Sequence, residues 1–361
     1  MTGFLAFRTA GSDHAVVAKA AGGTATVSAA PTAAVPPSPP PPGAAADPTL
    51  VSAGRPAPDG PRPKDIAAIQ GGAVVLLNGA DGHVLRTLAS HPEAATGGFP
   101  YLEGVSLSPD RKQVFYAVAG DCGAAQIFRV AADGKTPSRP VLTGVSPAVS
   151  PDGRKLAYAV ASPGPAPAPL AGAPAEEAGG RHCQNAIVVR DLHTGAERTW
   201  RYPDTPDYTT PLYANAVISE IAWAPDSTRL AYTLSYEGDS ISILDTDKDA
   251  DLSQTVEVVI PDGGGNSSHP AWQATTGRLG LFNTRFECCY DDNYSGPPRA
   301  LLVDPDRRSD SALLPPGTRV SVLDFDASGA HLLYVDSGRL YRRSGAAAPV
   351  ALATGVTHAD W

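Results

Sequence analysis

The chain has 361 residues, including 36 glycines and 36 prolines, a composition typical of a turn-rich β protein or of a chain with disordered segments. Its formal net charge of −9 argues against a nucleic-acid partner, because binding of phosphates requires a basic surface. No stretch of about eighteen apolar residues occurs, so the sequence predicts no transmembrane helix.

Residues 1–63 show neither the alternation of a strand nor the periodicity of a helix. They include the stretch VPPSPPPPG (Val35–Gly43), and such a tract favours extended polyproline conformations that cannot bury a core. We therefore predict a disordered Ala/Pro-rich segment or stalk over 1–63, with a docking motif for a proline-binding domain as the alternative. No clear signal peptide is visible, because Lys19 interrupts the apolar residues near the start.

From residue 64 onward, one unit recurs five times without gaps: an apolar residue, a tight turn and an apolar strand. This is the pattern of a β-hairpin. The turns begin at Ser108, Ser150, Ala224, Gln273 and Asp326. Directly before them stand Leu107, Val149, Trp223, Trp272 and Phe325. Eight residues after each turn begins stand Tyr116, Tyr158, Tyr232, Leu281 and Tyr334. We expect both sets in the core between repeats.

A third and a fourth apolar segment follow every hairpin, and four antiparallel strands per repeat are typical of the blades of a β-propeller. Residues 65–89 supply three further strands without a first strand. At the other end of the chain, THADW (Thr357–Trp361) resembles the first strand SHPAW (Ser268–Trp272). The sequence therefore predicts an all-β, six-bladed propeller over 64–361, in which the C-terminal strand pairs with the N-terminal blade and closes the ring.

The hairpin SPDGRKLAY (Ser150–Tyr158), with the later turn DLHTG (Asp191–Gly195), resembles the WD-like (PD-type) repeat of TolB-like propellers. The resemblance covers about residues 64–361 and implies a binding platform of the cell envelope, or the non-catalytic part of a prolyl-oligopeptidase-like peptidase. No amino-terminal TolB domain is visible, so the partner of TolB is not carried over. Abundant Ala, Gly, Pro and Arg with little Lys suggest a GC-rich bacterial genome, such as that of an actinobacterium.

All four cysteines fall in long loops that a propeller would place on one face, where ligands commonly bind. Their even number favours disulfides, and matching positions in neighbouring blades favour Cys122 with Cys183, which leaves Cys288 with Cys289. Metal binding by the thiols and His182 is the alternative, although no CxxC spacing supports it. The same loops carry the candidate binding-face residues Asp121, His182, Glu237, Asp239, Glu287, Tyr290, Asp291 and Asp292.

The segment DTDKDADLSQTVE places four carboxylates at alternate positions, namely Asp245, Asp247, Asp249 and Asp251. Alternating carboxylates can converge on Ca²⁺, so a structural calcium ion is one hypothesis. However, Ala250 replaces the glycine of a D-x-D-x-D-G loop, and Glu257 stands one position too late. These departures favour a solvated turn between the third and fourth strands of its blade.

Catalytic motifs are scarce, since no G-x-S-x-G elbow occurs. Glu103, Glu220 and Asp324 lie on predicted first strands and are the candidates for an acidic site at the central channel. His269 and His358 occupy matching positions before a first-strand tryptophan, and we attribute them to the repeat.

The sequence thus favours a monomeric, non-enzymatic, extracytoplasmic binding or scaffold propeller. Its partner would be a protein, a peptide or a glycan, and it has no certain cofactor. A propeller hydrolase or lyase with a metal-assisted or acidic site in the channel is the alternative. The regulatory propeller of a separate peptidase chain is a third reading that no motif supports.

Overall fold

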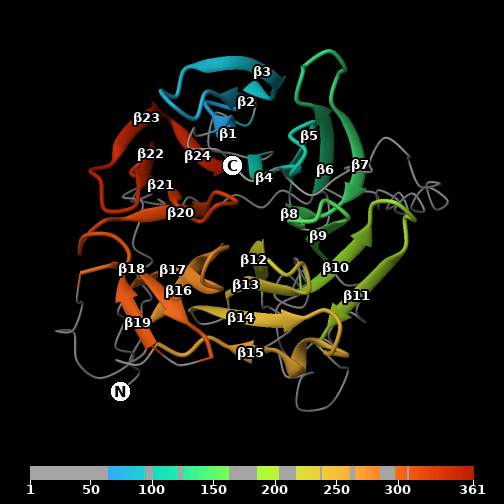
Figure 1. The fold of residues 1–361 in the computed structure, drawn as a ribbon. Helices are drawn as coiled ribbons and strands as arrows, with labels where there is room; N and C mark the ends of the chain where they lie inside the picture. The colour runs from blue at the N-terminus through green and yellow to red at the C-terminus, as the bar shows by residue number, and fades with distance from the viewer. Residues whose placement is uncertain are drawn as a thin grey trace, which may run out of the picture. The chain divides into compact units, whose positions relative to one another are not determined.

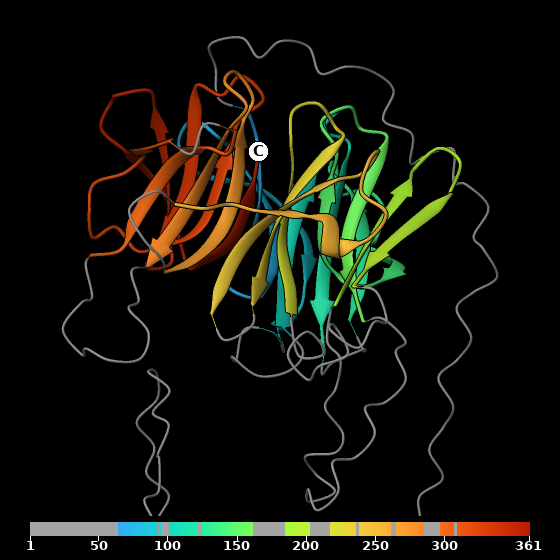
Figure 2. The ribbon, with the colours of Figure 1, turned by 90° about the horizontal axis from the view of Figure 1, so that it is seen from below.

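The computed structural model describes residues 64–92, 94, 101–120, 125–161, 185–202, 217–235, 238–260, 265–284, 297–306 and 309–361. These residues form twenty-four strands in six four-stranded antiparallel sheets, which are arranged around a common axis (Figure 1). After a 90° turn, the sheets are seen standing side by side as the blades of a ring (Figure 2). The predicted six-bladed β-propeller is thereby confirmed.

In every blade the strands follow one another from the axis to the rim. Blade 1 comprises β24 (Val356–Asp360), β1 (Ile66–Gln70), β2 (Ala73–Leu77) and β3 (Val84–Ser90). Blade 2 comprises β4 (Tyr101–Leu107), β5 (Gln113–Ala119), β6 (Gln126–Ala131) and β7 (Arg139–Thr143). Blade 3 comprises β8 (Val145–Val149), β9 (Lys155–Val160), β10 (Ala186–Asp191) and β11 (Glu197–Arg201).

The remaining three blades repeat this order. Blade 4 comprises β12 (Val217–Trp223), β13 (Arg229–Ser235), β14 (Asp239–Asp245) and β15 (Val256–Glu257), with the 3-10 helix η3 (Leu252–Gln254) before β15. Blade 5 comprises β16 (Asn266–Gln273), β17 (Arg278–Thr284), β18 (Arg299–Asp304) and β19 (Ser309–Ala312). Blade 6 comprises β20 (Val320–Phe325), β21 (His331–Asp336), β22 (Arg339–Ser344) and β23 (Val350–Thr354). Among the described residues, no helix is long and apolar enough to cross a membrane.

The turns of the inner hairpins are held by the side chains that recur in the sequence. In blade 3, Ser150 Oγ donates to the Asp152 carboxylate (2.6 Å) and accepts from the backbone N–H of Lys155 (2.9 Å). Gly153 N donates to Ser150 O (2.8 Å) and closes the turn. The equivalent residues of blade 2 make the same bonds. Serine and aspartate recur at these positions because their side chains satisfy the backbone of the turn.

The repeated tyrosines fill the space between blades, as predicted. Tyr116 and Tyr232 are fully buried, and Tyr158 is 4% exposed. Tyr116 also stacks on Phe128 of the next strand, with 5.4 Å between the ring centroids. Burial of a large side chain contributes about 1.5–3 kcal/mol, so this column is a main source of stability.

The ring is closed by the C-terminal strand. β24 pairs antiparallel with β1, with Asp360 opposite Ala67 and His358 opposite Ile69. It therefore becomes the innermost strand of blade 1, where the two ends of the propeller meet (Figure 1). This pairing covers a sheet edge that a linear array of blades would leave open.

Candidate binding site in the central channel

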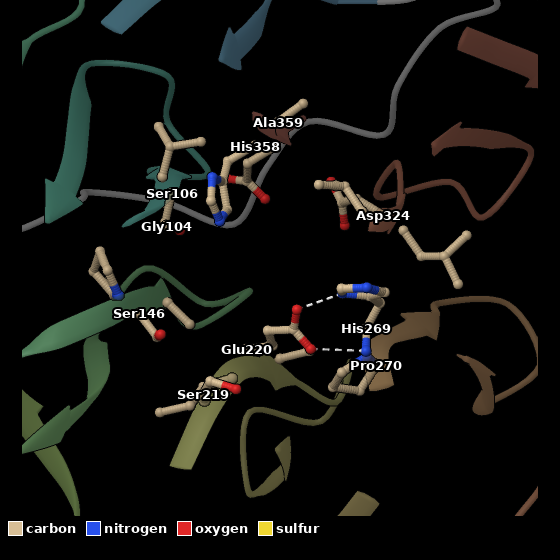
Figure 3. Close-up of a pocket in the computed structure, with 18 of the residues that line it drawn as sticks. Gly104, Ser106, Ser146, Ser219, Glu220, His269, Pro270, Asp324, His358 and Ala359 are labelled. Carbon is tan, nitrogen blue, oxygen red and sulfur yellow. Dashed lines mark hydrogen bonds and ion pairs between the residues drawn. The ribbon is translucent and has the colours of Figure 1, made fainter. Parts of the chain in front are cut away.

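A cavity of about 360 Å³ lies on the axis and is lined by the innermost strand of every blade. Its polar walls are formed by serines, carboxylic acids and two imidazoles, several of which are seen around the centre of the ring in Figure 3. The titratable side chains in the lining are Glu103, Glu220, His269, Asp324, His358 and Asp360. Because six separate strands contribute, the ring must close before this site exists.

Four of the six innermost strands are distorted at the same repeat position, four residues before the turn. There Gly104, Ser146, Glu220 and His269 adopt φ angles of 71°, 52°, 51° and 56°. The strand register shifts at each of these positions, as in a β-bulge. Left-handed backbone at a non-glycine residue costs about 1–2 kcal/mol, and such outliers cluster at functional sites. All four residues line the channel cavity.

Glu220 and His269 form an ion pair across the interface of blades 4 and 5. The His269 ring joins Glu220 Oε1 through Nδ1, while the His269 backbone N–H donates to Glu220 Oε2 (2.9 Å), as the dashed lines of Figure 3 show. Thr233 Oγ1 also donates to Glu220 Oε2 (2.8 Å). Burial alone would raise the pKa of Glu220, but these hydrogen bonds and the His269 charge hold it below its usual value.

Burial shifts the pKa values of two further titratable groups of this cavity towards their neutral forms. Removal from water lowers the pKa of His358 to about 4, although the Glu220 carboxylate opposes the shift. Burial likewise raises the pKa of Glu103, against hydrogen bonds from Tyr101 and Ser146. An imidazole that stays uncharged at neutral pH can both donate and accept hydrogen bonds.

A second and larger cavity, of about 1030 Å³, lies on the face where the first and second strands of each blade are joined. Turn residues such as Pro109, Pro151 and Pro225 line it. The residues that it shares with the first cavity are Ser106, Val149, Ala222, Asp324 and Asp360. The two cavities therefore adjoin along the axis.

Asp324 and Asp360 stand where the two cavities meet, and each carboxyl group affects the pKa of the other. Burial and the neighbouring Asp360 raise the pKa of Asp324 well above its usual value. Burial also raises the pKa of Asp360, to about 6. Two adjacent carboxyl groups behave in this way because they cannot both ionise at low cost.

The structure brings the predicted channel acids together: Glu103 and Glu220 line the first cavity and Asp324 its junction with the second. His269 and His358, which we had attributed to the repeat, also line the cavity, and Asp360 was missed altogether. The repeat alignment did contain a signal, because His269, His358 and Glu220 share one position on the innermost strands. Polar residues that recur at one position of the innermost strands were thus the sequence signal for the site.

Most of the predicted binding-face residues lie outside the described residues. This applies to all four cysteines, and so to both proposed disulfides, and to Asp121, His182, Glu237, Glu287, Tyr290, Asp291 and Asp292. Asp239 is described, and its carboxylate accepts a hydrogen bond from Ser235 Oγ (2.6 Å) at the end of the β13–β14 hairpin.

The loop suggested for calcium is the turn between β14 and β15. Asp245 accepts from the backbone of Asp247 (3.1 Å), Asp249 accepts from the backbone of Asp245 (2.7 Å), and Asp251 caps η3 through Ser253 N (2.9 Å). Within the described ranges, no group of three or more His, Cys, Asp or Glu side chains is arranged to hold a metal ion. The calcium site remains a prediction.

Comparison with known proteins supports the fold and little more. No protein-family model and no curated protein sequence matches the chain. TolB from Acinetobacter baumannii has a similar structure, with a TM-score of 0.54 and 14% identity over 82% of this chain and 66% of that protein. A proposed TolB from Agrobacterium tumefaciens gives a TM-score of 0.51 and 14% identity over 82% of this chain and 92% of that one. These likenesses support the six-bladed propeller fold and give no support to an actinobacterial origin.

Proposed function

We propose that this protein is a non-enzymatic, extracytoplasmic binding propeller whose central channel receives part of a protein, peptide or glycan partner. The observation that carries the proposal is the polar cavity at the axis, which is lined by all six blades and has left-handed backbone at Ser146, Glu220 and His269. Preformed concave sites with a few fixed polar groups are the usual form of a binding site.

The groups of the cavity suit hydrogen-bonding recognition. Glu220 fixes the orientation of the His269 ring through Nδ1. Burial lowers the pKa of His358 to about 4, so its imidazole is uncharged at neutral pH, and burial raises the pKa of Glu103. Among the described lining residues there is no lysine or arginine. A partner that brings hydrogen-bond donors therefore fits better than an anion.

The extracytoplasmic location rests on the likeness to TolB propellers and on the predicted disulfides and proline-rich stalk of residues 1–63. A stalk would hold the propeller away from the cell surface, with the loop-rich face free for a partner.

Blocking the channel tests this proposal. Ser219 lines the cavity, and Ser219→Trp would fill it, whereas Ser309→Trp adds the same side chain to the exposed start of β19. We expect the wild-type full chain and Ser309→Trp to capture the same partner from envelope extracts, and Ser219→Trp to lose it while melting normally. Equal capture by all three proteins would place binding elsewhere and refute the channel.

A propeller hydrolase or lyase is the second candidate, and the Glu220–His269 pair is the observation that favours it. A carboxylate that fixes the tautomer and orientation of an imidazole is the usual partner of a general base. Glu220→Gln removes the charge but keeps the shape. Activity of the wild type on a panel of esters and glycosides, abolished in Glu220→Gln, would establish an enzyme and overturn the binding proposal.

A further inference from the structure

The larger of the two cavities, named here the turn-face cavity, has a volume of about 1030 Å³ and takes no part in the proposed function. This volume lies at the upper end of the range for ligand pockets in proteins. The described part of the chain begins in the wall of the cavity, because Lys64 is one of its lining residues. The 63 residues that precede Lys64 are therefore attached to the propeller at this cavity.

The attachment point is held in place by contacts with blades 1 and 2. The Arg111 guanidinium, from the turn between β4 and β5, donates a hydrogen bond to Asp65 O. Lys64 O lies so close to Gly79 that a Cβ at this glycine would collide with it, and the same Cβ would touch the Trp361 ring. The chain therefore approaches β1 on a path that the two blades fix.

Rings of proline and tryptophan form the apolar part of the cavity wall. Pro109, Pro151 and Pro225 stand on the turns of blades 2, 3 and 4, and each of them is half-buried. Three of the four tryptophans of the chain also line the cavity, namely Trp223, Trp272 and Trp361. Grooves lined by aromatic rings bind proline-rich segments, because the extended polyproline conformation is already formed and loses little entropy on docking.

Carboxylic acids outnumber cations in the lining of the turn-face cavity. The cations Lys64 and Arg111 stand at the attachment point, whereas the lining aspartates are Asp152, Asp226, Asp324, Asp326 and Asp360.

Two of these aspartates are exposed, and both lie away from the attachment point. Asp152 and Asp226 belong to the turns of blades 3 and 4, and blade 4 lies across the ring from blade 1 (Figure 1). Among the described residues, Asp152 accepts hydrogen bonds at Oδ1 alone, from Ser150 Oγ (2.6 Å) and Arg154 N (3.0 Å). Its Oδ2 is therefore left for a further donor.

The residues directly before Lys64 complement this cavity in composition and in charge. The stretch RPAPDGPRP (Arg55–Pro63) contains four prolines, and its two arginines outnumber its one aspartate. Prolines favour an extended chain with about 3.1 Å per residue, so nine residues span at most about 28 Å. This length is more than enough to cross a cavity of about 1030 Å³ from Lys64 to the turns of blades 3 and 4.

We propose that Arg55–Pro63 docks in the turn-face cavity of its own propeller, with its prolines against the proline and tryptophan rings of the wall and its arginines directed at Asp152 and Asp226. Because the segment is attached at Lys64, its effective concentration at the cavity is in the millimolar range, and a contact too weak to hold a free peptide is enough. The two cavities adjoin, so the docked segment covers the turn-face end of the channel. The inference holds whether or not the channel binds a partner.

A photo-reactive residue in the full chain tests the docking. The residue p-benzoylphenylalanine in place of Ala57 keeps all four prolines and both arginines of the segment. After irradiation, mass spectrometry maps the cross-linked peptides, and a mixture of isotope-labelled and unlabelled chains separates links within one chain from links between two copies. We expect links within one chain to the turns that carry Pro151 and Pro225. Links to the loop-rich face, links to a second copy, or no link at all would each overturn the proposal.

The yield of this cross-link tests the charge pairing. Asp152→Asn keeps Oδ1 as the acceptor within its turn and removes the charge. We expect the yield at low ionic strength to fall about two- to fivefold, which is the effect of one exposed ion pair. The matched control is Asp133→Asn, because Asp133 is an exposed turn aspartate that accepts from Lys135 N (3.0 Å) in the same way and does not line the cavity. Equal yields in the two variants would refute the pairing of the segment with Asp152.

Discussion

The two sides of the ring are joined by different chemistry at the same repeat position. Around the closure, Asp324, Asp360 and Ser106 each accept a backbone N–H from the next blade. On the opposite side, that position is an alanine in blades 3, 4 and 5, namely Ala148, Ala222 and Ala271. There, interfaces rely on large aromatic side chains and the cations above them.

Trp223 illustrates how the blades are joined on the opposite side, where alanines replace the carboxylates. Its indole N–H donates to Ala148 O of the preceding blade (2.9 Å), and the Lys155 ammonium lies 5.5 Å from the centroid of its ring. Trp272, one blade further, carries the Arg229 guanidinium at 5.1 Å. Because the blades on this side follow one another in the chain, apolar packing is enough to hold them together. Where the ends of the propeller meet, charged groups add directional bonds.

Removal of the closing strand should have the largest effect. Deletion of residues 356–361 exposes the edge of β1 and removes Asp360, Trp361 and one wall of the channel. We expect loss of the cooperative thermal transition or aggregation, measured by circular dichroism and size-exclusion chromatography. A deletion of equal length at residues 2–7, outside the predicted propeller, is the control. Unchanged melting of the C-terminal deletion would show that closure contributes little.

A single substitution on the closure side should cause an intermediate loss in the free energy of unfolding. Asp360→Ala leaves the backbone N–H of the buried Leu107 without its acceptor. We expect a loss of about 1–3 kcal/mol in the free energy of unfolding by urea at pH 6. Asp360→Asn, which keeps an acceptor for Leu107 N, should lose less. Equal losses in both variants would mean that packing, and not the hydrogen bond, is what Asp360 supplies.

The fold was predictable because five blades repeat a tight turn followed by a buried side chain, which is a tyrosine in four of them, and local chemistry accounts for both features. The site was predictable only in part. Glu220 was found as an inward acid, but its pairing with His269 joins residues 49 positions apart and depends on the bulges of β12 and β16. Neither the left-handed backbone of Glu220 nor the approach of Asp324 to Asp360 leaves a pattern in the sequence, because the first is a local bulge of β12 and the second joins two different blades.

We expect the smallest loss of stability from a substitution on the side of the ring opposite the closure. Trp223→Phe keeps an aromatic ring near the Lys155 ammonium but removes the hydrogen bond to Ala148 O between blades 3 and 4, and we expect a loss of about 1 kcal/mol in the free energy of unfolding by urea. Trp361→Phe is the matched control on the closure side, because the indole N–H of Trp361 has no hydrogen-bond partner among the described residues. It should therefore lose less than Trp223→Phe, although both tryptophans hold the same repeat position. A larger loss at Trp361 would show that the closure, too, depends mainly on aromatic packing, and would remove the difference between the two sides of the ring.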